Sequence, residues 1–368
     1  GLDLVGLQLH IAAGGALDPE PPPPRGHSIE VRLYAEDPAR DWQPQSGTVH
    51  EFAVPVDTAR FSGLHESGIR VDSGIVDGSV VGVHYDPMLA KIISWAPDRT
   101  RAARMLAAAV AGMRLHGLHT NRDLLVNVLR HPAFLAGDTD TAFFDVHGLA
   151  SLAAPLASAE AEALSALAAA LADAAANRAA TPVAIAVPSG WRNLPSGPQS
   201  KRYRGVHATH TVRYRLTRTG LLTELDGIDT DGLGLVTHTP DRVVLDRGGL
   251  RREFAVARYG ETVHVDSSLG PVRLEHLPRF TDPAAQLVTG SLLAPMPGSV
   301  IRLGAEAGDT VTAGQPVLWL EAMKMEHTVT APTAGTLTEL NVDVGAQVAV
   351  GAVLAVVTPA TDPSGEQT

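Results

Sequence analysis

The sequence predicts a multidomain α+β protein, and three observations along the chain support this prediction. Residues 1–150 mix helical and strand-like periodicities, as a domain with both kinds of element does. An alanine-rich stretch at 151–180 precedes eight short alternating segments, which predicts a helix and then an antiparallel β-barrel. Residues 294–320 and 331–357 repeat one glycine-punctuated pattern, which predicts a small all-β domain shaped as a flattened barrel.

Composition limits the class of protein. The 368 residues are 45% hydrophobic and 19% charged, which is typical of chains that bury a core and suffices for two or three domains. The net charge of −11 argues against nucleic-acid binding, and no apolar run reaches the roughly 20 residues that cross a bilayer. The absence of cysteine excludes disulfides and fits a cytoplasmic location. Because the residues from Gly1 onward read as the middle of a domain, we expect a piece of a longer protein.

The first part of the chain is expected to contain strands and helices in alternation. An apolar segment predicts a helix that ends near Gly14, and residues 27–36 alternate as a half-buried strand does. In that strand Ile29, Val31 and Leu33 share one face, and Glu30 and Arg32 share the other. Two further helices are expected over residues 99–114 and about 120–130.

Two charged residues in this region are candidates for chemistry. Arg32 lies on the polar face of its predicted strand, and Asp86 lies in a loop at the end of another strand. From spacing alone, a structural ion pair between Arg32 and Asp86 is an equally good interpretation. The sequence has no paired carboxylates with metal-ligand spacing and no glycine-rich phosphate loop.

The middle of the chain is expected to be a helix followed by a barrel. The helix over 151–180 is interpreted as a linker with a narrow apolar packing stripe. The eight strand-like segments begin near residue 203 and end near 276. Trp191 is better explained as a core or barrel-mouth residue than as a partner contact. The histidines of this region have no metal-ligand spacing, and we interpret them as surface or sheet residues. They are His207, His210, His238 and His264.

Lys324 stands between Met323 and Met325 at the junction of the two repeats. A repeat of this kind predicts two similar sheets related by a pseudo-twofold axis, with a hairpin between them. Lys324 then lies at the tip of the hairpin, where its amine is exposed. An ordinary surface lysine in a turn would explain neither the repeat nor the two methionines. Residues 279–289, which precede this domain, are expected to be a flexible linker.

Three segments of the first region resemble the C-terminal part of a biotin carboxylase domain, which is of ATP-grasp type. They are residues 26–38, 83–95 and 117–144. The resemblance implies that Arg32 contacts biotin and stabilises its enolate, and that Asp86 lies close to Arg32. The residues of that family that bind MgATP and bicarbonate would precede Gly1. Both ligands are therefore expected only in the intact subunit, and this chain alone is expected to be inactive.

The lysine region resembles biotinyl domains. The resemblance rests on A-M-K-M at 322–325, A-P-M-P-G at 294–298 and A-P-x-x-G at 331–335. It implies that biotin is attached covalently to Lys324, and that Met323 and Met325 serve recognition by a biotin protein ligase. Lipoyl domains share this fold, but acidic or small polar residues usually flank their lysine.

Taken together, the resemblances identify the chain as similar to the α-subunits of acyl-CoA carboxylases. They imply a biotin carboxylase part at 1–150, a domain that contacts a carboxyltransferase β-subunit at 151–284, a biotinyl domain at 285–358 and a disordered tail at 359–368. The expected function is to carry biotin between ATP- and bicarbonate-dependent carboxylation and carboxyl transfer to an acyl-CoA held by the β-subunit. One alternative is a carrier or scaffold without catalytic activity. Pyruvate and urea carboxylases are a poorer match, because their additional domains are longer.

Overall fold

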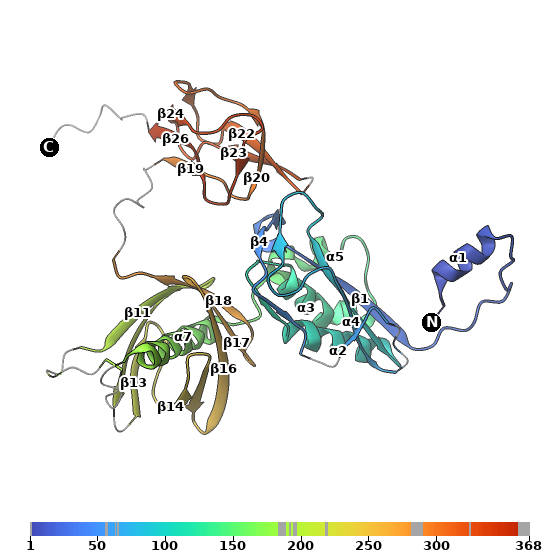
Figure 1. Ribbon diagram of the computed structural model, residues 1–368, viewed down its shortest axis with the longest axis horizontal. Helices are drawn as coiled ribbons and strands as arrows, with labels where there is room; N and C mark the ends of the chain where they lie inside the picture. Colours follow the sequence, from blue (N-terminus) through green and yellow to red (C-terminus); the bar gives the residue numbers. More distant parts are fainter. Residues whose placement is uncertain are drawn as a thin grey trace.

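The computed structural model describes residues 2–55, 58–62, 64, 66–182, 189–190, 193, 197–217, 220–280, 290–323 and 325–359. These residues form three units in chain order, each around a hydrophobic core of its own (Figure 1). The predicted multidomain α+β architecture is therefore confirmed. Trp191, most of the expected linker and residues 360–368 of the tail lie outside the described residues. None of the described helices is both long enough and apolar enough to span a membrane.

The first unit is built on a four-stranded sheet with one long helix against it. In order, the strands are β1 (His27–Tyr34), β9 (Met88–Ala96), β7 (Gly68–Ser73) and β6 (Thr58–Arg60). Helix α2 (Arg99–Ala111) packs on this sheet through buried residues that include Leu106 and Val110, as predicted. Burial alternates along β1, so that Glu30 and Arg32 share the exposed face. This alternation is what the sequence predicts for a strand with one buried face.

Shorter elements complete the first unit. Its remaining strands are β2 (Glu36–Asp37), β3 (Gln43–Pro44), β4 (Gly47–Thr48), β5 (Glu51–Ala53), β8 (Val80–Val81) and β10 (Arg114–His116). Its remaining helices are the 3-10 helix Pro38–Arg40, α3 (Arg122–Arg130), α4 (Pro132–Ala136), α5 (Phe143–His147) and α6 (Leu149–Leu152). The first helix of the chain, α1 (Leu4–Ala12), buries none of its residues and stands apart from the sheet (Figure 1).

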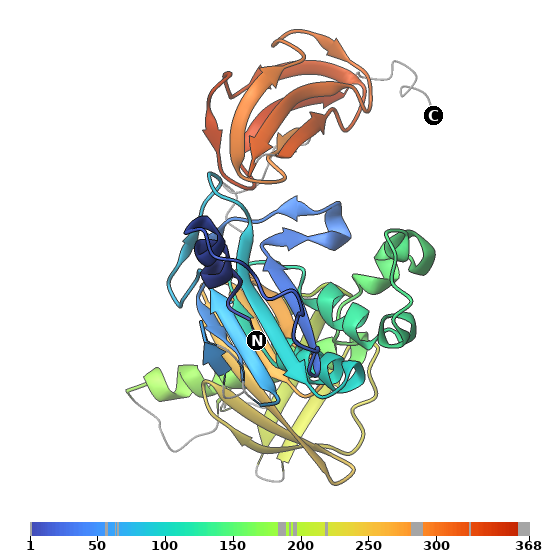
Figure 2. The same cartoon turned by 90° about the vertical axis from the view of Figure 1, so that its right-hand side faces the viewer.

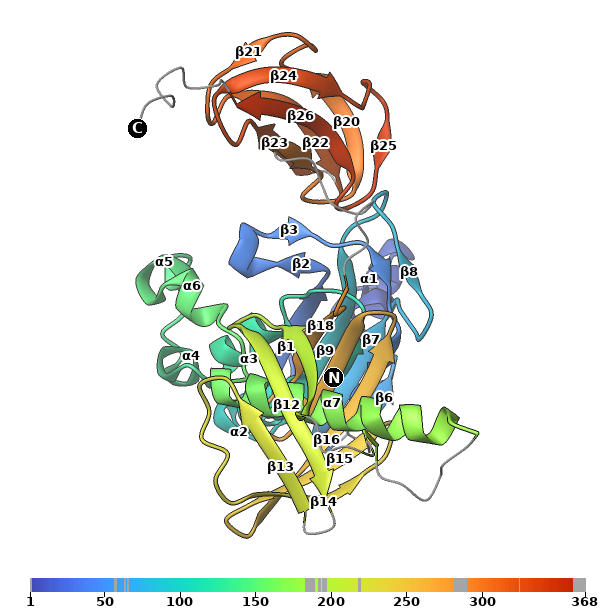
Figure 3. The ribbon, with the colours of Figure 1, turned by 90° about the vertical axis from the view of Figure 1, so that its left-hand side faces the viewer.

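The second unit is an eight-stranded antiparallel sheet curved around helix α7 (Ala159–Ala180) (Figure 3). Its strands are β11 (Gln199–Arg204), β12 (Thr209–Thr217), β13 (Gly220–Leu225), β14 (Leu233–His238), β15 (Arg242–Arg247), β16 (Leu250–Tyr259), β17 (Thr262–Ser267) and β18 (Val272–Leu277). The prediction of a linker helix with a narrow stripe was wrong. Every residue from Ala161 to Ala172 is buried. Alanine has so small a side chain that the strands can approach α7 from several sides, and α7 therefore forms the core of this unit.

The third unit is a flattened barrel of two four-stranded sheets, as predicted. One sheet has the order β19 (Ser291–Leu293), β26 (Val353–Pro359), β24 (Gly335–Leu340) and β21 (Thr310–Val311). The other has the order β23 (Met325–Thr330), β22 (Pro316–Ala322), β20 (Gly298–Leu303) and β25 (Gln347–Val348). Apolar residues of both sheets meet between them and form one core.

The sequence repeat is a structural repeat. Strands β20, β21 and β22 correspond to β24, β25 and β26 with the same offset of 37 at both ends of each strand. Equivalent main-chain hydrogen bonds join the two copies: Gly308 N to Leu337 O (2.8 Å) and Gly345 N to Val300 O (2.7 Å), and Gly314 N to Ala331 O (2.8 Å) and Gly351 N to Ala294 O (2.9 Å). Each copy therefore donates to the other, as a pseudo-twofold arrangement requires.

Candidate functional site

The hairpin between β22 and β23 holds the lysine motif. These strands pair as far as Ala322 and Met325, so that only Met323 and Lys324 connect them. Lys324 itself lies outside the described residues. Met323 has a positive φ of 50°, a conformation that lets a very short connection reverse the chain. The predicted hairpin at the junction of the repeats is therefore present, and its connection is as short as antiparallel strands commonly have.

The tip of this hairpin contacts the first unit. Met323 is only 7% exposed, and its amide donates a hydrogen bond of 3.0 Å to the carbonyl oxygen of Val83. The side chain of Val83 packs against the core of the third unit. Val83 precedes β9, whereas Met323 lies 240 positions further along the chain. Nothing in the sequence indicates this contact.

Arg32 lies on the exposed face of β1, in a cluster of charges. Its Nε donates to Glu30 Oε1 at 3.1 Å, and this hydrogen bond is the main cause that raises the pKa of Arg32. Lys91, which is opposite Arg32 in β9, places its Nζ 3.9 Å from the other oxygen of Glu30. Two cations thus share one carboxylate. The face carries a net positive charge that an anionic or electron-rich group can approach.

Asp86 lies next to this strand but does not pair with Arg32. Its carboxylate accepts a hydrogen bond of 3.0 Å from the Met88 amide. Among the described residues no ion pair joins Arg32 and Asp86, so the interpretation of a structural pair was wrong. The physical reason is that Glu30, two residues away on the same strand face, already occupies the guanidinium.

A carboxyl group from β2 lies near Asp86. Burial raises the pKa of the Glu36 carboxyl, and the negative charge of Asp86 raises it further. The Ala35 amide donates to the Pro87 carbonyl oxygen at 2.9 Å, which fixes the end of β1 against the loop that contains Asp86. The loop of Val83 and Asp86 is therefore anchored to the strand that carries Arg32.

A polar cluster that sequence analysis missed joins the first unit to the second. We call it the interdomain joint, and it consists of Glu51, Arg114, His116, Tyr259 and Asp266. His116 is 1% exposed, and its Nε2 lies 2.8 Å from Asp266. Its Nδ1 lies 3.2 Å from the Tyr259 hydroxyl and 3.3 Å from Glu51. Arg114 bridges the same two carboxylates. These partners are far apart in sequence, so no local pattern could have indicated them.

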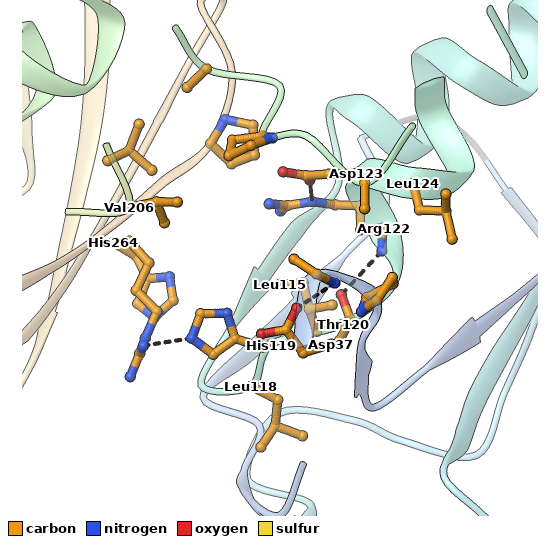
Figure 4. A pocket seen from close by; sticks show the side chains of 18 of the residues that line it. Asp37, Leu115, Leu118, His119, Thr120, Arg122, Asp123, Leu124, Val206 and His264 are labelled. Carbon is orange, nitrogen blue, oxygen red and sulfur yellow. Dashed lines mark hydrogen bonds and ion pairs between the residues drawn. The ribbon is translucent and has the colours of Figure 1, made fainter. Parts of the chain in front are cut away.

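A cavity of about 220 Å³ lies between the first and second units (Figure 4). Its polar lining is largely paired internally, as in Arg122 with Asp123 at 2.9 Å and Arg273 with His119 at 2.7 Å. Burial lowers the pKa of His264 to about 3, so this imidazole is neutral. His264 Nε2 is buried without a hydrogen-bond partner. None of the predicted site residues lines the cavity.

The histidines of the second unit are partly as expected. His210, His238 and His264 lie on strands, but His210 and His264 are buried. His210 Nε2 lies 2.7 Å from Glu162 Oε1, and this partner explains how the His210 imidazole can be buried. The described part of the chain holds no group of three potential ligands that could bind a metal ion.

Comparison with known families divides the chain as the three units do. Residues 30–146 match the biotin carboxylase C-terminal domain. Residues 160–279 match the BT domain of the methylcrotonyl-CoA carboxylase α-subunit. Residues 290–357 match the family described as biotin-requiring enzyme. The cofactor of this last family is the one that the lysine motif predicted.

Similar proteins align with nearly the whole of this chain. The chain is 30% identical to a mitochondrial methylcrotonoyl-CoA carboxylase α-subunit of Dictyostelium discoideum over 92% of this chain and 50% of that protein. It is 29% identical to a propionyl-CoA carboxylase α-chain of Ruegeria pomeroyi over 96% of this chain and 55% of that protein. The biotin carboxylase domain of a thermophilic 2-oxoglutarate carboxylase, solved with bicarbonate, is 32% identical over 40% of this chain and 32% of that chain, with a TM-score of 0.35.

These folds and matches define a chain of the biotin-dependent carboxylase class. More narrowly, it is similar along nearly its whole length to the α-subunits of acyl-CoA carboxylases, and it spans about half the length of the relatives it matches.

Proposed function

We propose that this chain carries biotin on Lys324 and serves a biotin-dependent acyl-CoA carboxylase. The observation that supports this most directly is the two-residue connection between β22 and β23, which contains Lys324 and joins the two halves of a symmetric barrel. A hairpin set on two packed sheets presents one side chain to a large ligase without disturbing the core. Biotin, when bound, supplies a ureido nitrogen that accepts and releases a carboxyl group. The chain supplies the mobile attachment, which raises the effective concentration of the group at each site it reaches.

The lysine content of the chain makes this proposal easy to test. The sequence has only three lysines, Lys91, Lys201 and Lys324. Lys91 lies near Glu30, and Lys201 donates to Asp173 and is partly buried. Both therefore hold their amines in ion pairs on the sides of sheets and not at a hairpin tip.

The test is labelling by a biotin protein ligase with ATP and biotin, followed by intact mass and peptide mapping. We expect one biotin per chain in the natural sequence and in the Lys91→Arg and Lys201→Arg variants. We expect none in Lys324→Arg. Labelling that persists in Lys324→Arg would exclude the proposed attachment site. Exclusive modification of Lys324 by a lipoate ligase would assign the domain to the lipoyl class instead.

We further propose that Arg32 stabilises negative charge that develops on biotin at the first active site. Its guanidinium stays charged at any physiological pH, and it is 58% exposed on a face that also presents Lys91. In a protein that also contains an ATP-binding half, Arg32→Ala should lower the rate of bicarbonate-dependent ADP release by roughly 10²–10³-fold. Labelling of Lys324 should be unchanged in the same variant. A rate equal to that of the natural sequence would remove Arg32 from this role.

The role proposed for Asp86 is to hold the loop beside Arg32. Its carboxylate caps the Met88 amide where β9 begins, and its charge acts on Glu36. For the second unit we propose contact with a carboxyltransferase β-subunit, on the strength of the match to the BT domain. Capture of the biotinylated full-length protein on avidin, followed by identification of the retained subunit and of its acyl-CoA, tests this partner. Recovery of the α-subunit alone under conditions that preserve complexes would contradict it.

A further inference from the structure

The segment Gly82–Tyr85, which we call the docking loop, runs from β8 toward β9 and reaches the third unit (Figure 2). Two kinds of contact meet at one of its residues. The carbonyl oxygen of Val83 accepts the amide of Met323 at 3.0 Å. The side chain of Val83 packs against the core of the third unit. The hydrogen bond sets the distance between Met323 and Val83, and the apolar contact of the Val83 side chain orients the third unit against the docking loop.

The docking loop is anchored in its own unit on both sides of Val83. Val81, two residues earlier, packs with the core of the first unit. On the other side, the Pro87 carbonyl oxygen accepts the Ala35 amide at the end of β1. Because both ends are held, Val83 projects from a fixed support and not from a free loop.

The arrangement relates the lysine hairpin to the charged face of β1. Ala35, which binds the Pro87 carbonyl oxygen, directly follows β1, the strand that carries Arg32. Asp86 lies in the chain between Val83 and Pro87. A hairpin held at Val83 is therefore held by the docking loop, which Asp86 directly follows in the chain. Figures 1 and 2 agree that this loop is where the first unit meets the third.

We propose that the docking loop is a binding surface for the lysine hairpin of the same chain, and that Val83 is its positioning residue. This docking rests on the proposed function, because it would bring the carrier lysine to the unit that contains Arg32. The occupant is the segment around Met323. Met323 then has a contact within the chain, in addition to the ligase recognition that the resemblance to biotinyl domains implies.

The chain contains no cysteine, so that an engineered pair reports docking without interference. Residues joined by a main-chain hydrogen bond have Cα atoms near the separation of about 5.5–6 Å that disulfides prefer. We expect the double variant Val83→Cys/Met323→Cys to form an intramolecular disulfide under mild oxidation, independent of protein concentration. The matched pair Val83→Cys/Thr336→Cys uses an exposed residue of β24 and should stay reduced. Equal cross-linking of the two pairs would overturn the proposal.

A second measurement uses a charge in place of a cross-link. In Val83→Glu the carboxylate would have to be buried against the apolar core of the third unit, so the hairpin should undock. We expect the Met323 amide to exchange its hydrogen about tenfold faster in this variant. Val80→Glu is the control, because Val80 lies in β8 just before the docking loop and is 76% exposed. Unchanged exchange in Val83→Glu would reject Val83 as the positioning residue.

Both measurements are made on the full chain without biotin. They can therefore fail while Lys324 is still labelled by the ligase, and they can succeed while Lys324 stays unmodified. A failure of docking is in this way separated from a failure of the carrier function.

Discussion

Glu162 lies near the start of α7 with its carboxylate buried against the turn before β12. It accepts hydrogen bonds from the amides of Val206, His207 and Ala208 at 2.8–3.1 Å, and from His210 at 2.7 Å. Burial raises the pKa of this carboxyl, but the hydrogen bonds outweigh burial and the net shift of the pKa is downward. One side chain thus fixes the helix inside the barrel.

Removal of this carboxylate should be costly. Glu162→Ala leaves three amides and a buried histidine without their acceptor, and we expect the free energy of unfolding of the second unit to fall by roughly 3–5 kcal/mol. Glu160→Ala is the control two residues earlier. Glu160 is exposed and pairs with Arg247, and its loss should cost less than about 1 kcal/mol. Denaturant unfolding measures both, and equal effects would contradict the assigned role.

The downward pKa shift of Glu162 also predicts a pH dependence. A carboxyl whose folded pKa is lowered stabilises the fold above its unfolded pKa, roughly 4.3, and loses this contribution as the pH falls through the folded pKa. The stability difference between the natural sequence and Glu162→Ala should therefore shrink on acidification below about pH 4. A difference that grows under these conditions would mean that the sign of the shift is wrong.

At the scale of elements, the third unit depends on close approach of paired strands. A Cβ atom added to Gly335 in β24 would lie 2.1 Å from the carbonyl oxygen of Thr358. The equivalent Gly298 in β20 faces the Glu321 carbonyl oxygen at 2.6 Å in the same way. Glu321 and Thr358 differ by the repeat offset of 37. These identical glycines in the two copies are therefore explained by packing, since any side chain would push the strands apart.

Gly335→Ala should consequently destabilise the third unit. We expect a loss of about 1–3 kcal/mol or more in its free energy of unfolding, because a main-chain oxygen cannot move aside as a side chain can. The neighbouring substitution Thr336→Ala removes an exposed side chain and should change stability by less than about 0.5 kcal/mol. Calorimetry of the full chain compares the two. A harmless Gly335→Ala would argue against the strand spacing seen here.

The interdomain joint links β10 of the first unit to β17 of the second. Burial raises the pKa of Asp266, while the hydrogen bond from His116 and the nearby charges lower it, and the net shift is downward. The ionised Asp266 therefore stabilises the folded joint above its ordinary pKa. Acidification through the lowered pKa should remove this contribution.

His116→Ala should loosen the contact between the two units. The substitution leaves the Asp266 carboxylate without its closest partner, at a cost of roughly 3 kcal/mol. Hydrogen exchange in β10 and β17 should accelerate, whereas His84→Ala, which alters an exposed side chain, should leave these strands unchanged. Protection that is the same in both variants would show that the joint does not hold the units together.

At the scale of the whole molecule, the chain combines a joined pair of units with a third that has a core of its own. The first two units share the interdomain joint and the cavity beside it. The third unit is attached through residues 281–289, which lie outside the described residues, and touches the first unit at Val83. Because the third unit has a core of its own, we expect it to stay folded when the contact at Val83 is broken.

Independent cores predict separate unfolding transitions. Leu320 is fully buried in the third unit and Leu167 in the second. Leu320→Ala should lower only the unfolding temperature of the third unit, and Leu167→Ala only that of the second unit. Each substitution should reduce the free energy of unfolding of its own unit by about 2–5 kcal/mol. Differential scanning calorimetry on the full chain shows which transition moves. A single transition that shifts equally in both variants would contradict independent folding.

The sequence by itself determined the elements and the repeat. The alternation of apolar and polar residues predicted that Arg32 lies on the exposed face of β1, and it also predicted the eight strands of the second unit. Burial of one face of a sheet imposes this period of two. The offset of 37 between the two copies determined the two sheets of the third unit and the hairpin at their junction. Its motifs also indicated biotin as the cofactor.

Only the tertiary structure decided how distant residues meet. Arg32 pairs with Glu30 and not with Asp86, α7 is a core and not a linker, and His116 reaches Asp266 across two units. The hairpin at Met323 rests on Val83 of the first unit. Local periodicity reports which face of an element is buried, but not what buries it. Partners that lie 150 or more positions apart are selected by the packing of whole units, which no short stretch of sequence specifies.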